Sequence, residues 1–239
     1  MRVCFDLHNH SCLSPCGSPL MFPSVLAIEA MDRGIDILAL TDHNSARNLP
    51  PFAEACDIAG IVGIFGLEVN TSEEVHVLAL FEQLESALDF GRFIEFLLPG
   101  IQNQASLFGE QTIVDINGDK IGEYGKSLFS AADIDFGDLV EEVLSRDGLV
   151  IPAHIDRPSN SVIANLGFLP DLPYSAVESI VVPSRYGIYN NTLIQGSDAH
   201  YIEHIGRRSC FAEVNERSFQ GLKQALSIKA ISYRNQWIQ

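Results

Sequence analysis

Short apolar runs alternate with polar loops and amphipathic stretches along this chain. The first run places Val3, Phe5 and Leu7 at a spacing of two, which predicts a half-buried β-strand. Further strand-sized apolar runs occupy residues 35–40, 61–65, 76–81 and 149–153. Helical spacing occupies residues 25–32, 50–59, 84–98 and 136–146, each followed by a glycine that can end a helix. This order predicts an α/β fold built on a mainly parallel sheet or barrel.

Residues 104–132 interrupt this order. Asn117-Gly118 in their middle is a dipeptide suited to a type I′ turn, so we expect a hairpin with strands at 112–116 and 119–122. Further strands are expected at 176–182, 192–195 and 209–214, and a closing helix at 217–229. No internal repeat and no low-complexity linker divides the chain. We therefore expect one domain over residues 1–239, with an insertion at about 104–132.

Composition narrows the class of protein. The 239 residues are 46% apolar, which is enough to bury a substantial core. No apolar run is long enough to suggest a membrane helix, and the N-terminus lacks a basic region followed by an apolar one, so no signal peptide is expected. Five cysteines, an odd number without a scaffold-like spacing, favour a reducing, cytoplasmic setting.

The charge argues against a nucleic-acid partner. There are 31 acidic residues against 15 basic ones, a formal net charge of −16. Such a surface repels phosphate backbones, and no stripe of lysine or arginine offsets it. An anionic small substrate would need metal ions and a few arginines for its binding.

The candidate chemistry lies in the histidines. His8 and His10 close the first strand, and residues two apart on a strand point to one face roughly 6.5–7 Å apart. A lone His-x-His is a weak signal for a metal site. However, six of the seven histidines fall at expected strand ends, where α/β barrels build their active sites. Only His204 does not.

Carboxylates stand in equivalent places, and together they predict a metal cluster. Asp42, Glu68 and Asp198 each follow or close an expected strand. One zinc ion takes about four ligands, so this many donors implies two or three divalent ions, with Glu68 available to bridge them. Zinc, iron and manganese all accept such ligands.

Taken in order, these motifs resemble the PHP family, named for polymerase and histidinol phosphatase domains. The resemblance covers nearly the whole chain. It implies a distorted (β/α)7 TIM-like barrel, a trinuclear metal centre and phosphoesterase chemistry. It also implies that Asp6 and Asp42 orient ligand histidines rather than bind metal. The metal ligands it implies are His8, His10, His43, Glu68, His76, His154, Asp198 and His200.

The chain departs from the family pattern after His10. Where members often carry a histidine or aspartate, this sequence has Ser14-Pro15-Cys16-Gly17. We expect Cys16 to be a ligand instead, since a thiolate binds zinc or iron well. A small buried cysteine is the alternative. Arg157 and Arg185 follow expected strands and could each clamp a phosphate, although a surface ion pair would also explain them.

The function expected from these features is hydrolysis of a phosphate mono- or diester of a small molecule. Metal-bound water has a pKa of about 7 and supplies a hydroxide nucleophile, with Glu68, Asp198 and His200 as catalytic residues. A nuclease acting on nucleic-acid ends, a non-catalytic metal-stabilised module and a metal-dependent amidohydrolase are the alternatives. The sequence predicts neither the substrate nor the oligomeric state.

Overall fold

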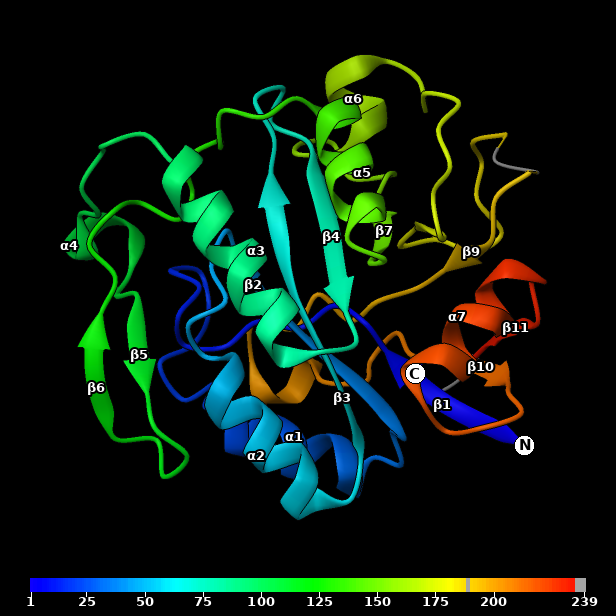
Figure 1. The fold of residues 1–239 in the computed structure, drawn as a ribbon, viewed down its shortest axis with the longest axis horizontal. Coiled ribbons are helices and arrows are strands. Elements are labelled where there is room, and N and C mark those ends of the chain that lie inside the picture. The colour runs from blue at the N-terminus through cyan, green and yellow to red at the C-terminus, as the bar shows by residue number, and fades with distance from the viewer. Residues whose placement is uncertain (188–189, 235–239) are drawn as a thin grey trace.

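The computed structural model describes residues 1–187 and 190–234 (Figure 1). A seven-stranded sheet in the order β11-β10-β1-β2-β3-β4-β7 forms its centre, accompanied by two small two-stranded sheets. The strands are β1 Arg2–Asp6, β2 Ile37–His43, β3 Val62–Asn70, β4 His76–Phe81, β5 Thr112–Val114, β6 Lys120–Glu123, β7 Leu149–Pro152, β8 Val177–Glu178, β9 Leu193–Ile194, β10 Cys210–Glu213 and β11 Ile231–Tyr233. The helices are α1 Pro23–Asp32, α2 Leu49–Ala59, α3 Leu84–Leu97, α4 Ala105–Phe108, α5 Phe136–Ser145, α6 Val162–Leu166, α7 Phe219–Ser227 and the 3-10 helix η1 Ile202–His204.

The large sheet is mixed, so the prediction of a mainly parallel sheet is wrong. Strand β2 runs parallel to β1 and β3, but β4 is antiparallel to both β3 and β7, and β1 is antiparallel to β10. The reason is the connection after β3, which is a short turn rather than a helix. A short connection forces the next strand to run back alongside the first. The strands curl into a half barrel, which confirms the distorted TIM-like α/β fold.

Alternating side chains divide the core into two layers. Leu38 and Leu40 of β2 pack in one hydrophobic cluster with α1, α2, α3 and α5. Ile37 and Ala39 of the same strand pack in the other cluster, which includes Phe219 of α7. We call the second side of the sheet the α7 face. Because both faces are covered, the central strands are apolar throughout rather than alternating with polar residues.

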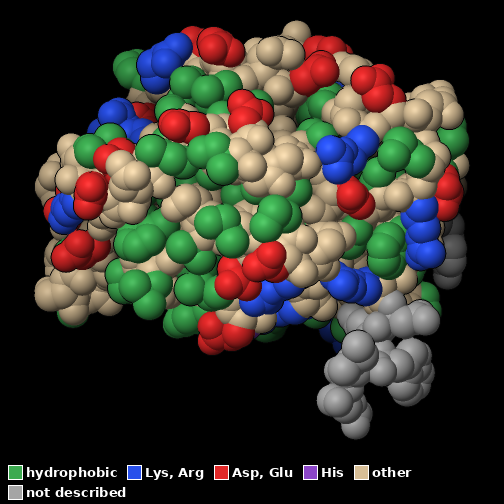
Figure 2. All heavy atoms as spheres, turned by 90° about the horizontal axis from the view of Figure 1, so that it is seen from below, with side chains coloured by type: hydrophobic (Ala, Val, Ile, Leu, Met, Phe, Trp, Pro, Cys, Tyr) green, Lys and Arg blue, Asp and Glu red, His purple; other side chains and the backbone are tan. Residues whose placement is uncertain are grey.

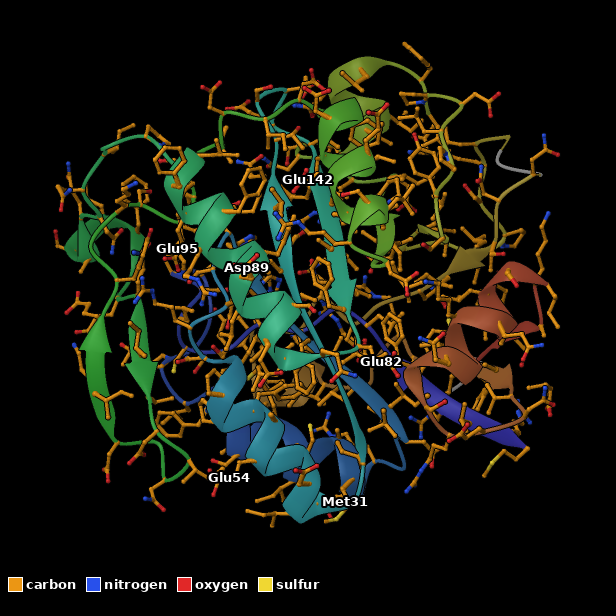
Figure 3. All side chains as sticks on the ribbon, viewed as in Figure 1. Met31, Glu54, Glu82, Asp89, Glu95 and Glu142 are labelled. Carbon is orange, nitrogen blue, oxygen red and sulfur yellow. The ribbon has the colours of Figure 1, made fainter. Side chains whose placement is uncertain are left out.

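Ion pairs connect the outer helices. Asp89 of α3 and Glu142 of α5 both pair with Arg146, at 2.9 Å and 2.7 Å (Figure 3). Glu95, further along α3, pairs with Arg47 at 2.7 Å. Partly exposed pairs of this kind contribute little energy each, so packing of the helices holds the layers together. The face shown in Figure 2 mixes acidic, basic and apolar side chains, and no described histidine is visible on it.

The expected hairpin is present as β5 and β6, beside α4 at the left of Figure 1. Its turn differs from the expectation. Gly118 has a positive φ of 86°, but Asn117 does not, which excludes a type I′ turn. Instead, the Asp115 carboxylate accepts hydrogen bonds from the backbone N–H groups of Asn117 and Asp119. The side chain of Asn48 fastens β5 to the barrel through Thr112 and Val114.

Helix α3 approaches the loop after β2 so closely that only glycine fits at position 91. A Cβ atom there would lie 2.6 Å from the Ala46 Cβ. We expect Gly91→Ala to lower the free energy of unfolding by about 1–3 kcal/mol through overpacking, although alanine favours helices by about 1 kcal/mol. Urea unfolding measures the change. Gly137→Ala in α5, where the nearest neighbour of the new Cβ lies at 3.4 Å, is the control and should not destabilise. Equal effects at both positions would contradict the close approach.

Candidate metal centre

The candidate ligands on β2, β3 and β4 meet because they share a face and an edge of the sheet. His43 lies on the α7 face of β2, by its alternation with Ile37 and Ala39. Glu68 pairs in register with His43, and His76 begins the antiparallel strand beside it. An antiparallel strand starts where its neighbour ends. His76 therefore lies with the others although it opens its strand.

Glu68 lies at the centre of the cluster. Its two carboxylate oxygens approach five imidazole rings within 2.8–3.3 Å. These rings belong to His8, His10, His43, His76 and His154. Its side chain is only 1% exposed, so water cannot solvate the carboxylate. This position suits a carboxylate that bridges metal ions.

A second centre of contacts surrounds Asp198. Its Oδ1 lies 3.5 Å from His8 Nε2, 3.4 Å from His10 Nε2 and 3.4 Å from His200 Nδ1. The His10 and His200 rings stack with centroids 4.2 Å apart. The loop between β9 and η1 thus returns to the end of β1, where the isolated bridge between Asn9 and Ala199 joins the two segments.

All eight residues that the family resemblance implies as ligands converge here. Within the described residues they form four overlapping groups, in each of which the possible ligand atoms lie within 4.8 Å of one another. The groups are His10/His43/His200, His8/His10/Asp198, His8/Glu68/His154 and His43/Glu68/His76. Four groups that share members indicate a site for more than one ion. Each group alone is short of the four ligands that a tetrahedral site needs, so sharing is required.

The distances between the donor atoms, and their missing hydrogen bonds, suit bound divalent ions. His8 Nε2 and His10 Nε2 lie 3.2 Å apart, close to the roughly 3.3 Å between two nitrogens on one tetrahedral zinc. Glu68 Oε2, Asp198 Oδ1 and His154 Nδ1 are buried and lack a hydrogen-bond partner among the described residues. An unsatisfied buried polar atom is costly, and a bound cation would remove that cost for the two carboxylate oxygens.

Burial and mutual charge shift the protonation of the cluster. Burial favours a raised pKa for Glu68, but the imidazoles of His76, His8 and His43 outweigh it and hold this pKa well below its usual range. Burial lowers the pKa of His43 strongly and that of His200 to about 4. Neutral imidazole is the form that binds metal. His43 and His200 are therefore ready to bind at neutral pH.

His8 behaves differently because a second carboxylate faces its other nitrogen. Burial alone would lower the pKa of His8, but Glu178 and Glu68 raise it well above the usual value. The Nδ1 atom of His8 lies 3.0 Å from Glu178 Oε2, and the backbone N–H of His154 donates to Glu178 Oε1 at 3.0 Å. A carboxylate on the far nitrogen fixes the ring and its tautomer, as is usual for metal-binding histidines.

Glu178 was not predicted from the sequence. The available signal was that Glu178 is the one acidic residue inside the apolar run 176–182. In the structure Glu178 is 2% exposed. The position of the Glu178 carboxylate also requires a glycine at residue 196. A Cβ at position 196 would collide with the Glu178 carboxylate and with the His8 Cβ.

The two aspartates expected to orient histidines act indirectly. Asp42 accepts a 2.7 Å hydrogen bond from Ser14 Oγ, and this hydroxyl lies 3.0 Å from His10 Nδ1. Among the described residues, Asp6 has no hydrogen bond or ion pair with an imidazole ring. It accepts from the backbone N–H groups of Ser197 and Gly206, and so holds the strand-end loop that carries Asp198.

Backbone strain coincides with the cluster. His154 and Asp198 have φ angles of 29° and 48°, and Asn44, directly after His43, has φ of 50°. Residues other than glycine rarely adopt positive φ, which costs about 1–3 kcal/mol each. Outside the cluster, the same conformation occurs at Glu74, Asp147, Asn160 and Lys229.

The remaining predicted residues lie at different distances from the cluster. Arg157 donates to Asp198 Oδ2 at 3.0 Å and so lies at its edge. Arg185 is exposed and its guanidinium lies 5.1 Å from the centroid of the Tyr186 ring. Cys16 is half-buried and belongs to none of the four groups of described residues, and burial raises the pKa of its thiol. The proposal that Cys16 is a ligand stays a prediction.

Comparison with known proteins identifies the family. Residues 6–145 match the PHP domain. The chain belongs to the PHP domain family of metal-dependent phosphoesterases. No curated protein sequence matches it.

Solved structures share the PHP fold at low sequence identity. The lesion-specific endonuclease EndoQ of Pyrococcus furiosus matches with a TM-score of 0.72 at 18% identity, over 98% of this chain and 58% of that one. Endonuclease Q in complex with a 27-mer duplex bearing an abasic lesion gives 0.72 at 19% identity. A metal-dependent phosphoesterase structure from Bifidobacterium adolescentis gives 0.61 at 17%, over 95% of this chain and 96% of that one. The PHP chain thus spans under three fifths of the endonuclease.

The contact between Glu178 and His8 generates a prediction about metal affinity. Glu178→Gln keeps the size of the side chain but removes the charge that faces His8 Nδ1. We expect metal affinity to fall about 10- to 100-fold. Competition with a chelator measures it, and Glu216→Gln, an exposed position, is the control. Unchanged affinity in Glu178→Gln would show that Glu178 does not position His8.

Proposed function

We propose that this PHP protein hydrolyses phosphate mono- or diesters of a small molecule with the help of two or three divalent ions. The observation that carries the proposal is the buried Glu68 carboxylate among five imidazoles, with one carboxylate oxygen that has no hydrogen bond from the part of the chain that the structure describes. Zinc, iron and manganese all suit this ligand set. The same residues that the family resemblance implies would hold the ions.

The ions, when bound, would activate a water as the nucleophile and offset the charge of the phosphoryl oxygens. The protein would hold each donor in place. Glu178 fixes His8, Ser14 and Asp42 fix His10, and Asp6 fixes the loop that carries Asp198. Such support keeps the donors within the narrow geometry that the chemistry needs.

Arg157 is proposed to bind the phosphoryl group. One N–H of its guanidinium bonds Asp198, and the side chain is 37% exposed. A guanidinium has five donors in a planar fork, so others stay available to a substrate oxygen. Arg185 is proposed as a second anion-binding residue, on the sequence argument alone.

The alternative is a nuclease, which the fold similarity to endonuclease Q favours. The charge opposes it, because a chain with a net charge of −16 repels a long polyanion more than it repels one phosphate. A phosphate-release screen over small esters, run beside single-stranded and abasic duplex DNA, separates the two. Cleavage of DNA without hydrolysis of small esters would favour the nuclease.

As for membranes, no helix in residues 1–187 or 190–234 is long and apolar enough to cross one.

The proposed bridging role of Glu68 predicts a linked loss of metal and activity. Purified protein should carry two or three ions and hydrolyse an aryl phosphate ester. Glu68→Ala removes the shared carboxylate, so we expect the loss of at least one ion and of most activity. Elemental analysis and phosphate release measure both, with Glu141→Ala, at an exposed position of α5, as the control. Full activity and metal content in Glu68→Ala would refute the proposal.

The proposed role of Arg157 predicts weaker substrate binding without loss of metal. A charge-assisted hydrogen bond contributes about 1.5–3 kcal/mol, so Arg157→Ala should lower kcat/KM roughly 10- to 150-fold. Arg157→Lys keeps the charge but loses the fork, and should recover only part of this. Arg92→Ala, an exposed arginine of α3, is the control. An unchanged kcat/KM in Arg157→Ala would exclude a substrate contact.

A further inference from the structure

An aromatic side chain from the insertion lies against the metal centre. The Phe129 ring has its centroid 5.8 Å from that of His43. Among the ring contacts of the described residues, this is the one that joins a phenylalanine to a candidate metal ligand. Phe129 is 38% exposed, so its ring is open to solvent on one side.

A second phenylalanine extends this surface away from the metals. Phe108, in α4, meets the Phe129 ring edge-on, with centroids 6.0 Å apart and planes at 66°. It is 49% exposed. Neither ring belongs to the buried hydrophobic clusters. Aromatic rings stabilise a fold mainly when they are buried. Two neighbouring rings that stay open to water beside a polar centre therefore contribute little to the core.

Two buried asparagines hold the backbone that carries Phe129 in place through hydrogen bonds. Asn44 donates to the carbonyls of Leu128 and Ser130 at 2.9 Å and 3.0 Å. Asn70 donates to the carbonyl of Phe129 itself at 3.1 Å. Three carbonyls in succession are therefore bound by side-chain amides.

These asparagines belong to the metal-bearing strands. Asn44 directly follows His43, and Asn70 closes the strand of Glu68. The Asn44 Oδ1 atom also accepts from the Asn70 N–H at 2.9 Å, which joins the two. The position of the Phe129 ring is thus coupled to the residues that would hold the ions. Such a fixed position is what a substrate contact needs.

We propose that Phe129, extended by Phe108, stacks on a planar aromatic group of the substrate. The preferred esters are then those that carry an aromatic group close to the phosphate, either an aryl ring or a nucleobase. This inference rests on the proposed function and deepens it. The phosphoryl group lies at the ions and Arg157, and the aromatic group leaves the cluster past His43. Stacking on a phenylalanine tolerates many rings, because every base or aryl group has a π-face.

The first test measures binding, independently of catalysis. Protein loaded with Mn²⁺ or Zn²⁺ is titrated calorimetrically with phenylphosphonate and with methylphosphonate, which do not hydrolyse. Phe129→Ala should weaken the binding of phenylphosphonate roughly 5- to 100-fold and leave that of methylphosphonate within about twofold. Phe96→Ala, an equally large but 82% exposed residue of α3, is the control and should change neither.

The second test measures turnover of phenyl phosphate, AMP and ethyl phosphate. The ratio of kcat/KM between variant and wild type is compared for each ester, so that differences in leaving group cancel. Phe129→Ala should lose activity toward phenyl phosphate or AMP and keep it toward ethyl phosphate. A loss confined to AMP assigns the surface to a nucleobase, and a loss confined to phenyl phosphate assigns it to an aryl ring.

Two further variants distinguish stacking on the substrate from a role in which Phe129 only shields His43 from solvent. Phe129→Leu keeps an apolar side chain but removes the ring, and should resemble Phe129→Ala in its substrate preference. Phe108→Ala should give a smaller loss of the same kind, and it decides the matter if Phe129→Ala fails to fold. Metal content should stay that of the wild type in all of them.

Equal losses toward aromatic and alkyl esters would overturn the stacking role, as would equal binding of both phosphonates by Phe129→Ala. A wild-type protein that hydrolyses no phosphate ester would instead refute the proposed function. The phosphonate titration would still report on the aromatic surface in that case. The two failures are therefore distinguishable.

Discussion

The buried carboxylate of Glu68 is the interaction on which the rest of this structure depends. Five imidazole rings from four segments of the chain surround one side chain that is 1% exposed. A charge placed in such a site without compensation would cost several kcal/mol. The ends of β1, β2, β4 and β7 therefore have to meet in one position. The half barrel is the arrangement that makes them meet.

The supporting residues show how much of the fold serves this position. Glu178, Ser14, Asp42 and Asp6 each satisfy a donor or a backbone group beside a candidate ligand. Glycine at 196 leaves the space in which Glu178 reaches His8. Positive φ angles at His154 and Asp198 are tolerated because several such contacts hold the backbone. The local strain is offset by the network as a whole, not by any single bond.

The sequence predicted the cluster better than it predicted the sheet. Histidines and carboxylates that follow apolar runs are visible as local patterns, whereas the register that pairs His43 with Glu68 is seen only in the structure. The direction of β4 was missed because the third strand was expected to end at residue 65, whereas β3 continues to Asn70 and leaves only a short turn before β4. Glu178 was missed for another reason: its strand has only two residues, and its role depends on a contact with His8 across 170 positions. Asn117-Gly118 indicated a hairpin correctly, but the Asp115 side chain determined the turn.

Charge and shape act at different ranges in this PHP protein. The net charge of −16 acts through solvent and is screened beyond about 8–10 Å at physiological salt, so it opposes the approach of long polyanions more than the final contact. Among the described residues of the site, cationic groups are few. Arg157 bonds the Asp198 carboxylate, and Arg207 donates to the carbonyls of Ser197 and Asp198. Under the proposed function, electrostatic attraction for one phosphate would come mainly from bound ions, and this attraction would be the same for any phosphate ester. Discrimination between esters would then come from the group beyond the phosphate, and the Phe129 ring, whose centroid lies 5.8 Å from that of the His43 ring, would be placed to contact that group.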